Sequence, residues 1–169
     1  MLKNKLADKI NQQLNFEFFS ANIYLQMSAW AETNKFAGAA VYLKKQAQEE
    51  MGHMLKIFDY LNQKGVMAQI GKIDAPSTEF KSIHELFKDI LAHEKIVTKR
   101  INDLSQQAWA DKDLTTFNFL QWFVTEQHEE ETQFQSILDK FDLVGTDKRG
   151  LFMIDQELAQ MAAARVEEI

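Results

Sequence analysis

Two short acidic segments of the sequence carry side chains of the kinds that bind metal ions. Glu50 stands three positions before His53 in the segment QEEMGHM, and Gln127 stands three positions before Glu130 in the segment TEQHEEE. Residues three positions apart lie on the same side of an α-helix, about one turn from each other. Carboxylate oxygens, imidazole nitrogens and amide oxygens are protein ligands for divalent cations. The spacing therefore predicts a pair of ligands on one face of each of two helices.

Two further glutamates interrupt apolar patterns in the same way. A helix of a bundle buries a stripe of side chains that repeats every three to four residues, and such stripes run through four parts of this sequence. Each stripe is mostly apolar but contains polar side chains near its middle. In chain order these polar side chains are Glu17, Glu50, His53, Glu94, Gln127 and Glu130. We expect them to lie at a similar depth inside a helical bundle.

Buried carboxylates in such numbers require compensation. An isolated carboxylate in a protein interior is very costly, and neighbouring carboxylates also repel one another. Either most of these groups are protonated, or cations neutralise them. A pair of divalent metal ions satisfies the set, because bundle proteins hold two metals with one glutamate from each of two helices and Glu-x-x-His from each of the others.

The ligand set is not symmetric, because Gln127 and Glu130 stand where a second Glu-x-x-His pair would be. One metal therefore keeps an imidazole ligand, from His53, and the other is held mainly by carboxylate oxygens. We expect the second site to be the weaker one, since an ion held by hard oxygen ligands exchanges readily. The other histidines lie off the stripes and are expected to be exposed or to have other partners: His84, His93 and His128.

Three more glutamates and a tyrosine lie close to these positions in the sequence. Glu49, Glu126 and Glu129 fit either a third cation site beside the pair or a solvated acidic face. Tyr24 lies seven residues after Glu17 and therefore on the same face, two turns further along. Its hydroxyl is placed to bind a ligand carboxylate or to supply an electron, and the alternative is an ordinary core tyrosine.

The elements that must position these side chains are long helices, because the chain contains one proline and six glycines. We predict helices over about 2–33, 37–64, 83–110, 113–141 and 147–164, with no strands, in a single domain spanning 1–169. Ser82, as part of an S-x-x-E pattern with Glu85, and Asp113 are predicted to cap the third and fourth helices. The connections are short, long and short, which predicts an all-α four-helix bundle with one long crossover and a short fifth C-terminal helix.

Composition excludes several other classes of protein. The net charge of −6 disfavours nucleic acid and anionic membranes as partners but is compatible with small cations. The absence of cysteine excludes disulfides, zinc–thiolate sites and iron–sulfur clusters. The first residues lack the apolar core of a signal peptide, and no apolar run is long enough to cross a bilayer. We therefore expect a soluble cytoplasmic protein.

Taken together, the sequence resembles the bacterial non-haem ferritins over essentially its whole length. The resemblance is carried by NFEFFSANIYLQMSAW in the first helix, QEEMGHM in the second, HEKIVTKRI in the third and WFVTEQHEEE in the fourth. It implies an iron-storage protein with ferroxidase activity, which oxidises Fe²⁺ to Fe³⁺ with O₂ or H₂O₂. It also implies a hollow shell of twenty-four subunits, in which the fifth helix, with ELAQMAAARV, lines the four-fold axis.

The resemblance also implies a role for each ligand. The first iron site would be formed by Glu17, Glu50, His53 and Glu94. The second would be formed by Glu50, Glu94, Gln127 and Glu130, with Glu50 and Glu94 able to bridge. A third iron would be held by Glu49, Glu126, Glu129 and Glu130. Tyr24 matches the tyrosine that lies beside the iron centre in this family.

Related proteins fit the sequence less well. A haem-binding bacterioferritin would carry Glu-x-x-His in the fourth helix, so no haem is expected, although Met51 occupies the position of its haem-ligating methionine. Mini-ferritins lack the fifth helix, and rubrerythrin needs cysteines. A non-catalytic acidic bundle that only buffers cations is the rival from another functional class.

Overall fold

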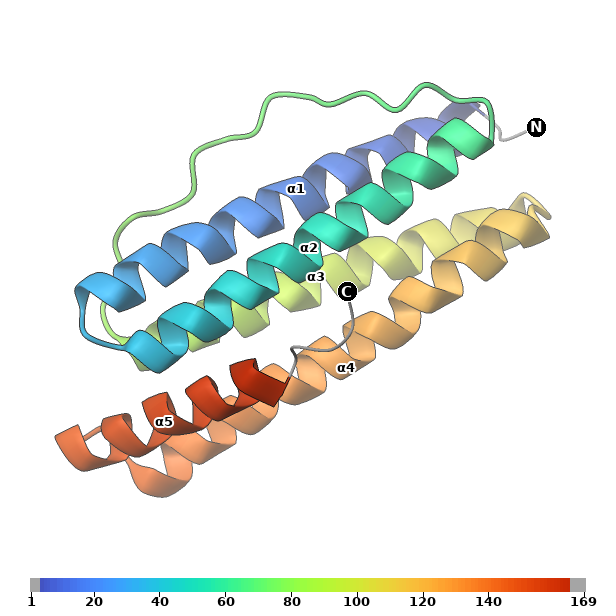
Figure 1. Cartoon of the computed structure of the whole chain (residues 1–169). Coiled ribbons are helices and arrows are strands. Elements are labelled where there is room, and N and C mark those ends of the chain that lie inside the picture. Colours follow the sequence, from blue (N-terminus) through green and yellow to red (C-terminus); the bar gives the residue numbers. More distant parts are fainter. Residues whose placement is uncertain (1–3, 165–169) are drawn as a thin grey trace.

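Long helices make up most of the chain that the computed structural model describes, residues 4–164 (Figure 1). They are α1 (Asn4–Thr33), α2 (Ala37–Gln63), α3 (Ile83–Ala110), α4 (Leu114–Val144) and α5 (Lys148–Ala164). The predicted all-α fold is thus confirmed, including the long crossover and the short fifth helix. Leu2 and Lys3 of the predicted first helix, and Arg165 and Val166 after the fifth, lie outside the described residues.

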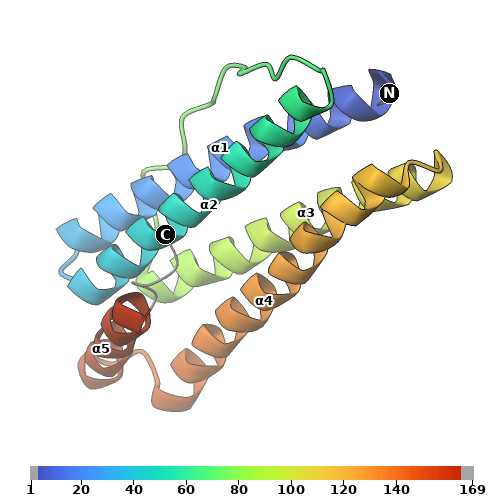
Figure 2. The same cartoon turned by 45° about the vertical axis from the view of Figure 1, so that its right-hand side comes forward.

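The four long helices form two antiparallel pairs. Figures 1 and 2 show α1 beside α2 and α3 beside α4, each pair joined by a short connection. The long connection between α2 and α3 returns along the length of the bundle, so that these two helices run in the same direction. Among residues 4–164, none of the helices combines the length and the apolar character needed to span a lipid bilayer.

Local sequence signals set the ends of the helices. The Ser82 hydroxyl accepts a hydrogen bond from the backbone N–H of Glu85 at 3.1 Å, and the Asp113 carboxylate accepts one from Thr116 at 3.0 Å, so both predicted caps are present. Helix α4 continues to Val144, beyond its predicted end near Phe141. It stops only at Gly145, whose φ of 80° suits a residue without a side chain.

The core of the bundle consists of two apolar parts with a polar layer between them. The part nearer α5 includes Tyr24, Leu43, Phe87 and Phe134. The part nearer the start of α1 includes Leu14, Ile57, Ile101 and Phe123. In each long helix, the polar residues singled out from the sequence lie between its contributions to these two parts. The apolar side chains on either side therefore hold the polar layer in place and keep water away from it.

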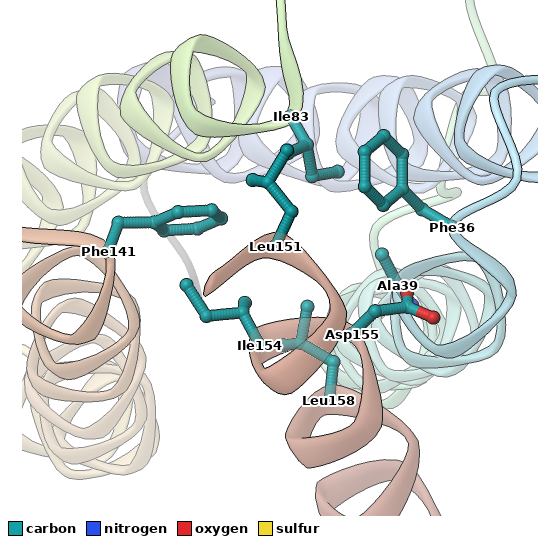
Figure 3. A pocket seen from close by; sticks show the side chains of 8 residues that line it. All are labelled: Phe36, Ala39, Ile83, Phe141, Leu151, Ile154, Asp155 and Leu158. Carbon is teal, nitrogen blue, oxygen red and sulfur yellow. The ribbon is translucent and has the colours of Figure 1, made fainter. Parts of the chain in front are cut away.

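Helix α5 docks against the start of α2 through one carboxylate. Asp155 accepts hydrogen bonds from the backbone N–H groups of Gly38 at 3.1 Å and Ala39 at 2.8 Å. The first backbone N–H groups of α2 lack partners within the helix, and the local N-cap residue, Phe36, makes no side-chain hydrogen bond to them. Asp155 therefore caps α2 from another helix. Beside this contact, Figure 3 shows a small pocket lined mainly by apolar side chains, among them those of Phe141 and Ile154.

Close packing at this contact predicts that Gly38→Ala weakens the docking of α5. A Cβ atom at residue 38 would lie 1.9 Å from the backbone oxygen of Asp155, so that one helix must move. We expect a loss of about 1–3 kcal/mol in the free energy of unfolding, as for other overpacked sites. The measurement is the Tm by circular dichroism. Gly52→Ala is the control, because a Cβ there meets nothing within 4 Å and the exchange favours helix by about 0.5–1 kcal/mol. Equal Tm values for the two variants would contradict this account.

Candidate metal centre

The polar layer consists of the side chains that interrupt the four apolar stripes. All are at most 5% exposed, and they are Glu17 on α1, Glu50 and His53 on α2, Glu94 on α3, and Gln127 and Glu130 on α4. They are buried because each takes an inward position in the 3.6-residue repeat of its helix. Four helices thus place ligand-type side chains in the middle of one bundle.

Glu17, Glu50 and His53 converge within this layer. Each offers a ligand atom, and the three atoms lie within 4.8 Å of one another. Oε2 of Glu50 is 3.5 Å from Nδ1 of His53. Oε2 of Glu17, Oε2 of Glu50 and Nδ1 of His53 are all buried without a hydrogen-bond partner. Buried polar atoms without partners are costly. Two carboxylate oxygens and one imidazole nitrogen in this arrangement fit a divalent cation such as Fe²⁺.

The carboxylates nearer α4 are arranged differently, because hydrogen bonds occupy them. The Tyr24 hydroxyl donates to Oε1 of Glu94, and Nε2 of Gln127 donates to Oε2 of Glu94 at 2.9 Å. Nε2 of Gln46 lies 3.2 and 3.1 Å from the two oxygens of Glu130 and donates to that carboxylate. Within residues 4–164, neither Glu94 nor Glu130 belongs to a group of three acidic or histidine ligand atoms within the 4.8 Å limit.

The residues considered for a third site are less enclosed. Glu49 and Glu126 are half-buried and Glu129 is exposed. In the part of the chain that the structure describes, these three are not gathered into a group within 4.8 Å. Among the other histidines, His128 is exposed and His93 is half-buried, with Nε2 at 2.7 Å from the Ser20 hydroxyl. His93 therefore has a partner outside the centre, as expected from its place off the stripe.

Burial shifts the protonation of the polar layer. It raises the pKa of Glu17 well above the ordinary value, and the charge of Glu50 raises it further. Burial also raises the pKa of Glu50 and of Glu94, and the charge of Glu94 adds to the effect at Glu50. The pKa of Tyr24 is raised by burial and by Glu94, so its hydroxyl stays protonated and donates. Without a cation these carboxyls keep their protons to a higher pH than an exposed carboxyl does, and a binding metal ion competes with those protons.

Two glutamines were not assigned roles from the sequence. Gln13 is 1% exposed and donates to Oε1 of Glu17 at 2.8 Å. Gln46 is fully buried and lies on the inward stripe of α2, but its contact with Glu130 crosses to another helix. Position on the stripe was the available signal for Gln46. For Gln13 the signal was its spacing of four residues from Glu17, which places two side chains on neighbouring turns of one helix.

Comparison with known proteins identifies the family to which this arrangement of helices belongs. The Ferritin-like domain family matches residues 7–144. The chain belongs to the ferritin family. It is 46% identical over 161 residues to the bacterial non-heme ferritin of Escherichia coli O157:H7, covering 95% of this chain and 98% of that protein. It is 48% identical over 162 residues to a probable bacterial non-heme ferritin-like protein of Haemophilus influenzae, covering 96% and 98%.

Solved structures of ferritins are similar to this chain as well. Chlorobium tepidum ferritin is 46% identical with a TM-score of 0.85, and 94% of this chain and 97% of that chain are covered. An open pore ferritin from Archaeoglobus fulgidus is 37% identical with a TM-score of 0.91, and 94% and 96% are covered. Both identities are high enough for the likeness to concern the family as well as the fold.

The polar layer of this ferritin has two unequal sides. Glu17, Glu50 and His53 each offer one buried polar atom that has no geometric hydrogen-bond partner and is available to a cation. A cation bound by Glu94 and Glu130 must compete with the donors that already hold these carboxylates, namely Tyr24, Gln46 and Gln127. The first side is therefore prepared for a cation, and the second must exchange hydrogen bonds to accept one.

Proposed function

We propose that this ferritin oxidises Fe²⁺ at a di-iron centre inside each subunit and stores the product as a ferric oxide-hydroxide mineral. The observation that carries the proposal is the convergence of Glu17, Glu50 and His53, with unpartnered ligand atoms, in the interior of a ferritin bundle. A structural core gains nothing from three such atoms, whereas a cation satisfies them together. Storage follows from membership of the family and from relatives named as ferritins.

The ligands are proposed to divide between two iron sites. The first iron is bound by Glu17, Glu50, His53 and Glu94. The second is bound by Glu50, Glu94, Gln127 and Glu130, with Glu50 and Glu94 shared between the two. Because Glu130, which belongs to the second site alone, is already hydrogen-bonded to Gln46, the second site binds its ion more weakly than the first. This order supports an exchangeable second iron, which a storage protein needs in order to pass iron onward.

The oxidation step balances with two iron ions. Each Fe²⁺ gives one electron, so that 2 Fe²⁺ + O₂ + 2 H⁺ yields 2 Fe³⁺ + H₂O₂, and 2 Fe²⁺ + H₂O₂ + 2 H⁺ yields 2 Fe³⁺ + 2 H₂O. The carboxylates neutralise the charge of the bound ions, and His53 fixes the first of them. Fe³⁺ lowers the pKa of bound water, so that hydrolysis releases protons and forms the mineral. Tyr24, hydrogen-bonded to Glu94, is placed to position that ligand or to supply an electron.

The proposal includes the assembly. Iron mineral requires an enclosed volume that one subunit does not provide, and we propose a shell of twenty-four subunits in the cytoplasm. We also propose that the protein works without haem, in keeping with relatives named as non-heme ferritins. Met51, half-buried on α2, is then an apolar packing residue.

Aerobic addition of Fe²⁺ to the metal-free protein tests the function. We expect oxygen consumption, and ferric absorbance that develops faster than with iron alone. A bundle that only buffers cations would bind Fe²⁺ without accelerating its oxidation. Oxidation no faster than in buffer would therefore contradict the ferroxidase proposal and favour that rival.

A third iron site is proposed at Glu49, Glu126, Glu129 and Glu130. Its support is that Glu126 lies one helical turn before Glu130 on α4, that Glu49 adjoins Glu50 in the sequence, and that Glu49 and Glu126 are half-buried. Anomalous diffraction from iron-soaked crystals measures it directly, with a third peak per subunit expected beside these carboxylates. Glu126→Ala should remove that peak and leave the peak beside His53. Two peaks in the wild-type protein would limit the centre to the di-iron pair.

A further inference from the structure

A chain of hydrogen bonds leads from the side of α3 to Glu17. Nε of Arg100 donates to Oε1 of Gln13 at 2.7 Å, and Nε2 of Gln13 donates to Oε1 of Glu17 at 2.8 Å. The Arg100 guanidinium carbon lies 4.2 Å from the centre of the Phe16 ring, and Nη2 donates to the carbonyl of Gln12 at 3.3 Å. These contacts with α1 hold Arg100, which is half-buried, in one orientation.

Arg100 determines which way the buried amide of Gln13 faces. A glutamine amide has a donor and an acceptor of nearly the same shape, so it can bind in two orientations. An arginine offers only donors, and Gln13 must therefore present its oxygen to Arg100. Its NH₂ group is then left facing Glu17. Gln13 is 1% exposed, so no bulk water competes for either end of the amide.

The oriented amide gives the two carboxylate oxygens of Glu17 different surroundings. Oε1 is occupied by the hydrogen bond from Gln13, whereas Oε2 is unpartnered and buried. A ligand atom of Glu17 converges with those of Glu50 and His53. The carboxylate can thus bind a cation through one oxygen while the other is held by the protein. Side chains that orient a metal ligand in this way typically change metal affinity 10–100-fold when they are removed.

We propose that Gln13 and Arg100 are positioning residues that hold Glu17 as a one-oxygen ligand and thereby set the affinity of the first cation site. The inference rests on the proposed iron site and adds two residues that do not touch the metal. Glu50 differs in its proposed role, because it is shared between the two ions whereas Glu17 belongs to the first site alone.

Anaerobic titration of the metal-free protein with Co²⁺ alone tests this inference, because Co²⁺ reports its ligands in its visible spectrum. We expect Gln13→Met and Arg100→Met each to weaken the tightest Co²⁺ site by about 10-fold and to shift its spectrum. Arg100→Lys keeps a donor for Gln13 and should retain most of the affinity. The double variant should be no weaker than Gln13→Met, because both changes break the same chain.

The matched control is Lys99→Met, the neighbouring cation on α3, which is exposed and pairs with Asp103 at 2.7 Å. It should leave Co²⁺ affinity and spectrum unchanged. If Gln13→Met and Arg100→Met, with wild-type helix content, bind Co²⁺ as the wild type does, the positioning role is wrong. If instead Glu50→Ala binds Co²⁺ as the wild type does, or neither protein binds it, the cation site itself is wrong and the proposed function fails with it.

Discussion

Replacing both Glu50 and His53 with alanine is expected to slow the initial oxidation of Fe²⁺ by about 100-fold or more. The double change removes two of the three side chains that converge in the polar layer. It also removes the carboxylate proposed to bridge the two ions, so that neither site stays complete. Electrons must leave two neighbouring Fe²⁺ ions together to reduce O₂ to H₂O₂, and one weakly held ion supplies only one of them.

The rate is measured from ferric absorbance and oxygen consumption in the first seconds after addition of about two Fe²⁺ per subunit, which matches the proposed di-iron pair. A matched control is Glu32→Ala with His128→Ala, which removes the same two types of side chain from exposed positions on α1 and α4. The control should oxidise iron at the wild-type rate. Wild-type rates in the Glu50 and His53 variant would show that the chemistry takes place elsewhere.

Helix periodicity predicted the composition of the polar layer well, because burial along one helix is a local property. Glu17 and Glu94 were assigned inward positions from the spacing of their apolar neighbours alone, and both are buried. In a long helix without breakers the repeat is continuous. The inward-facing residues on either side therefore fix the face on which the residue between them lies.

Helix periodicity could not predict the hydrogen bonds that hold the polar layer. Gln46 reaches Glu130 and Arg100 reaches Gln13, and both contacts depend on how far one helix is rotated and shifted against another. No repeat in a single helix contains that information. The cap that Asp155 provides for α2 is a contact of the same kind, because it joins segments that are far apart in the sequence.

The buried carboxylates also predict how the stability of the metal-free protein depends on pH. Folding raises the pKa of Glu17, Glu50 and Glu94, so the folded chain retains protons that the unfolded chain has released. Above the ordinary value of 4.5, unfolding therefore releases protons, and stability falls as the pH rises towards the folded-state pKa. Each such group contributes a slope of up to about 1.4 kcal/mol per pH unit.

Glu50→Gln should therefore change Tm in opposite directions in the absence and in the presence of metal. Without metal it removes a carboxyl whose pKa is raised by burial, so it is expected to raise Tm and to flatten its pH dependence above the ordinary carboxyl value of 4.5. With Co²⁺ present, the wild type gains about 2.7 kcal/mol at a hundredfold excess over Kd, and the variant loses most of that gain. Thermal unfolding with a chelator and with Co²⁺ measures both, and Glu32→Gln, an exposed glutamate of α1, is the control. Parallel pH curves for Glu50→Gln and the wild type would mean that Glu50 carries its charge at no cost in the metal-free fold. A flatter pH curve for Glu50→Gln would show that burying the Glu50 carboxyl destabilises the fold when no cation is bound. That cost is expected if the polar layer is retained for binding iron.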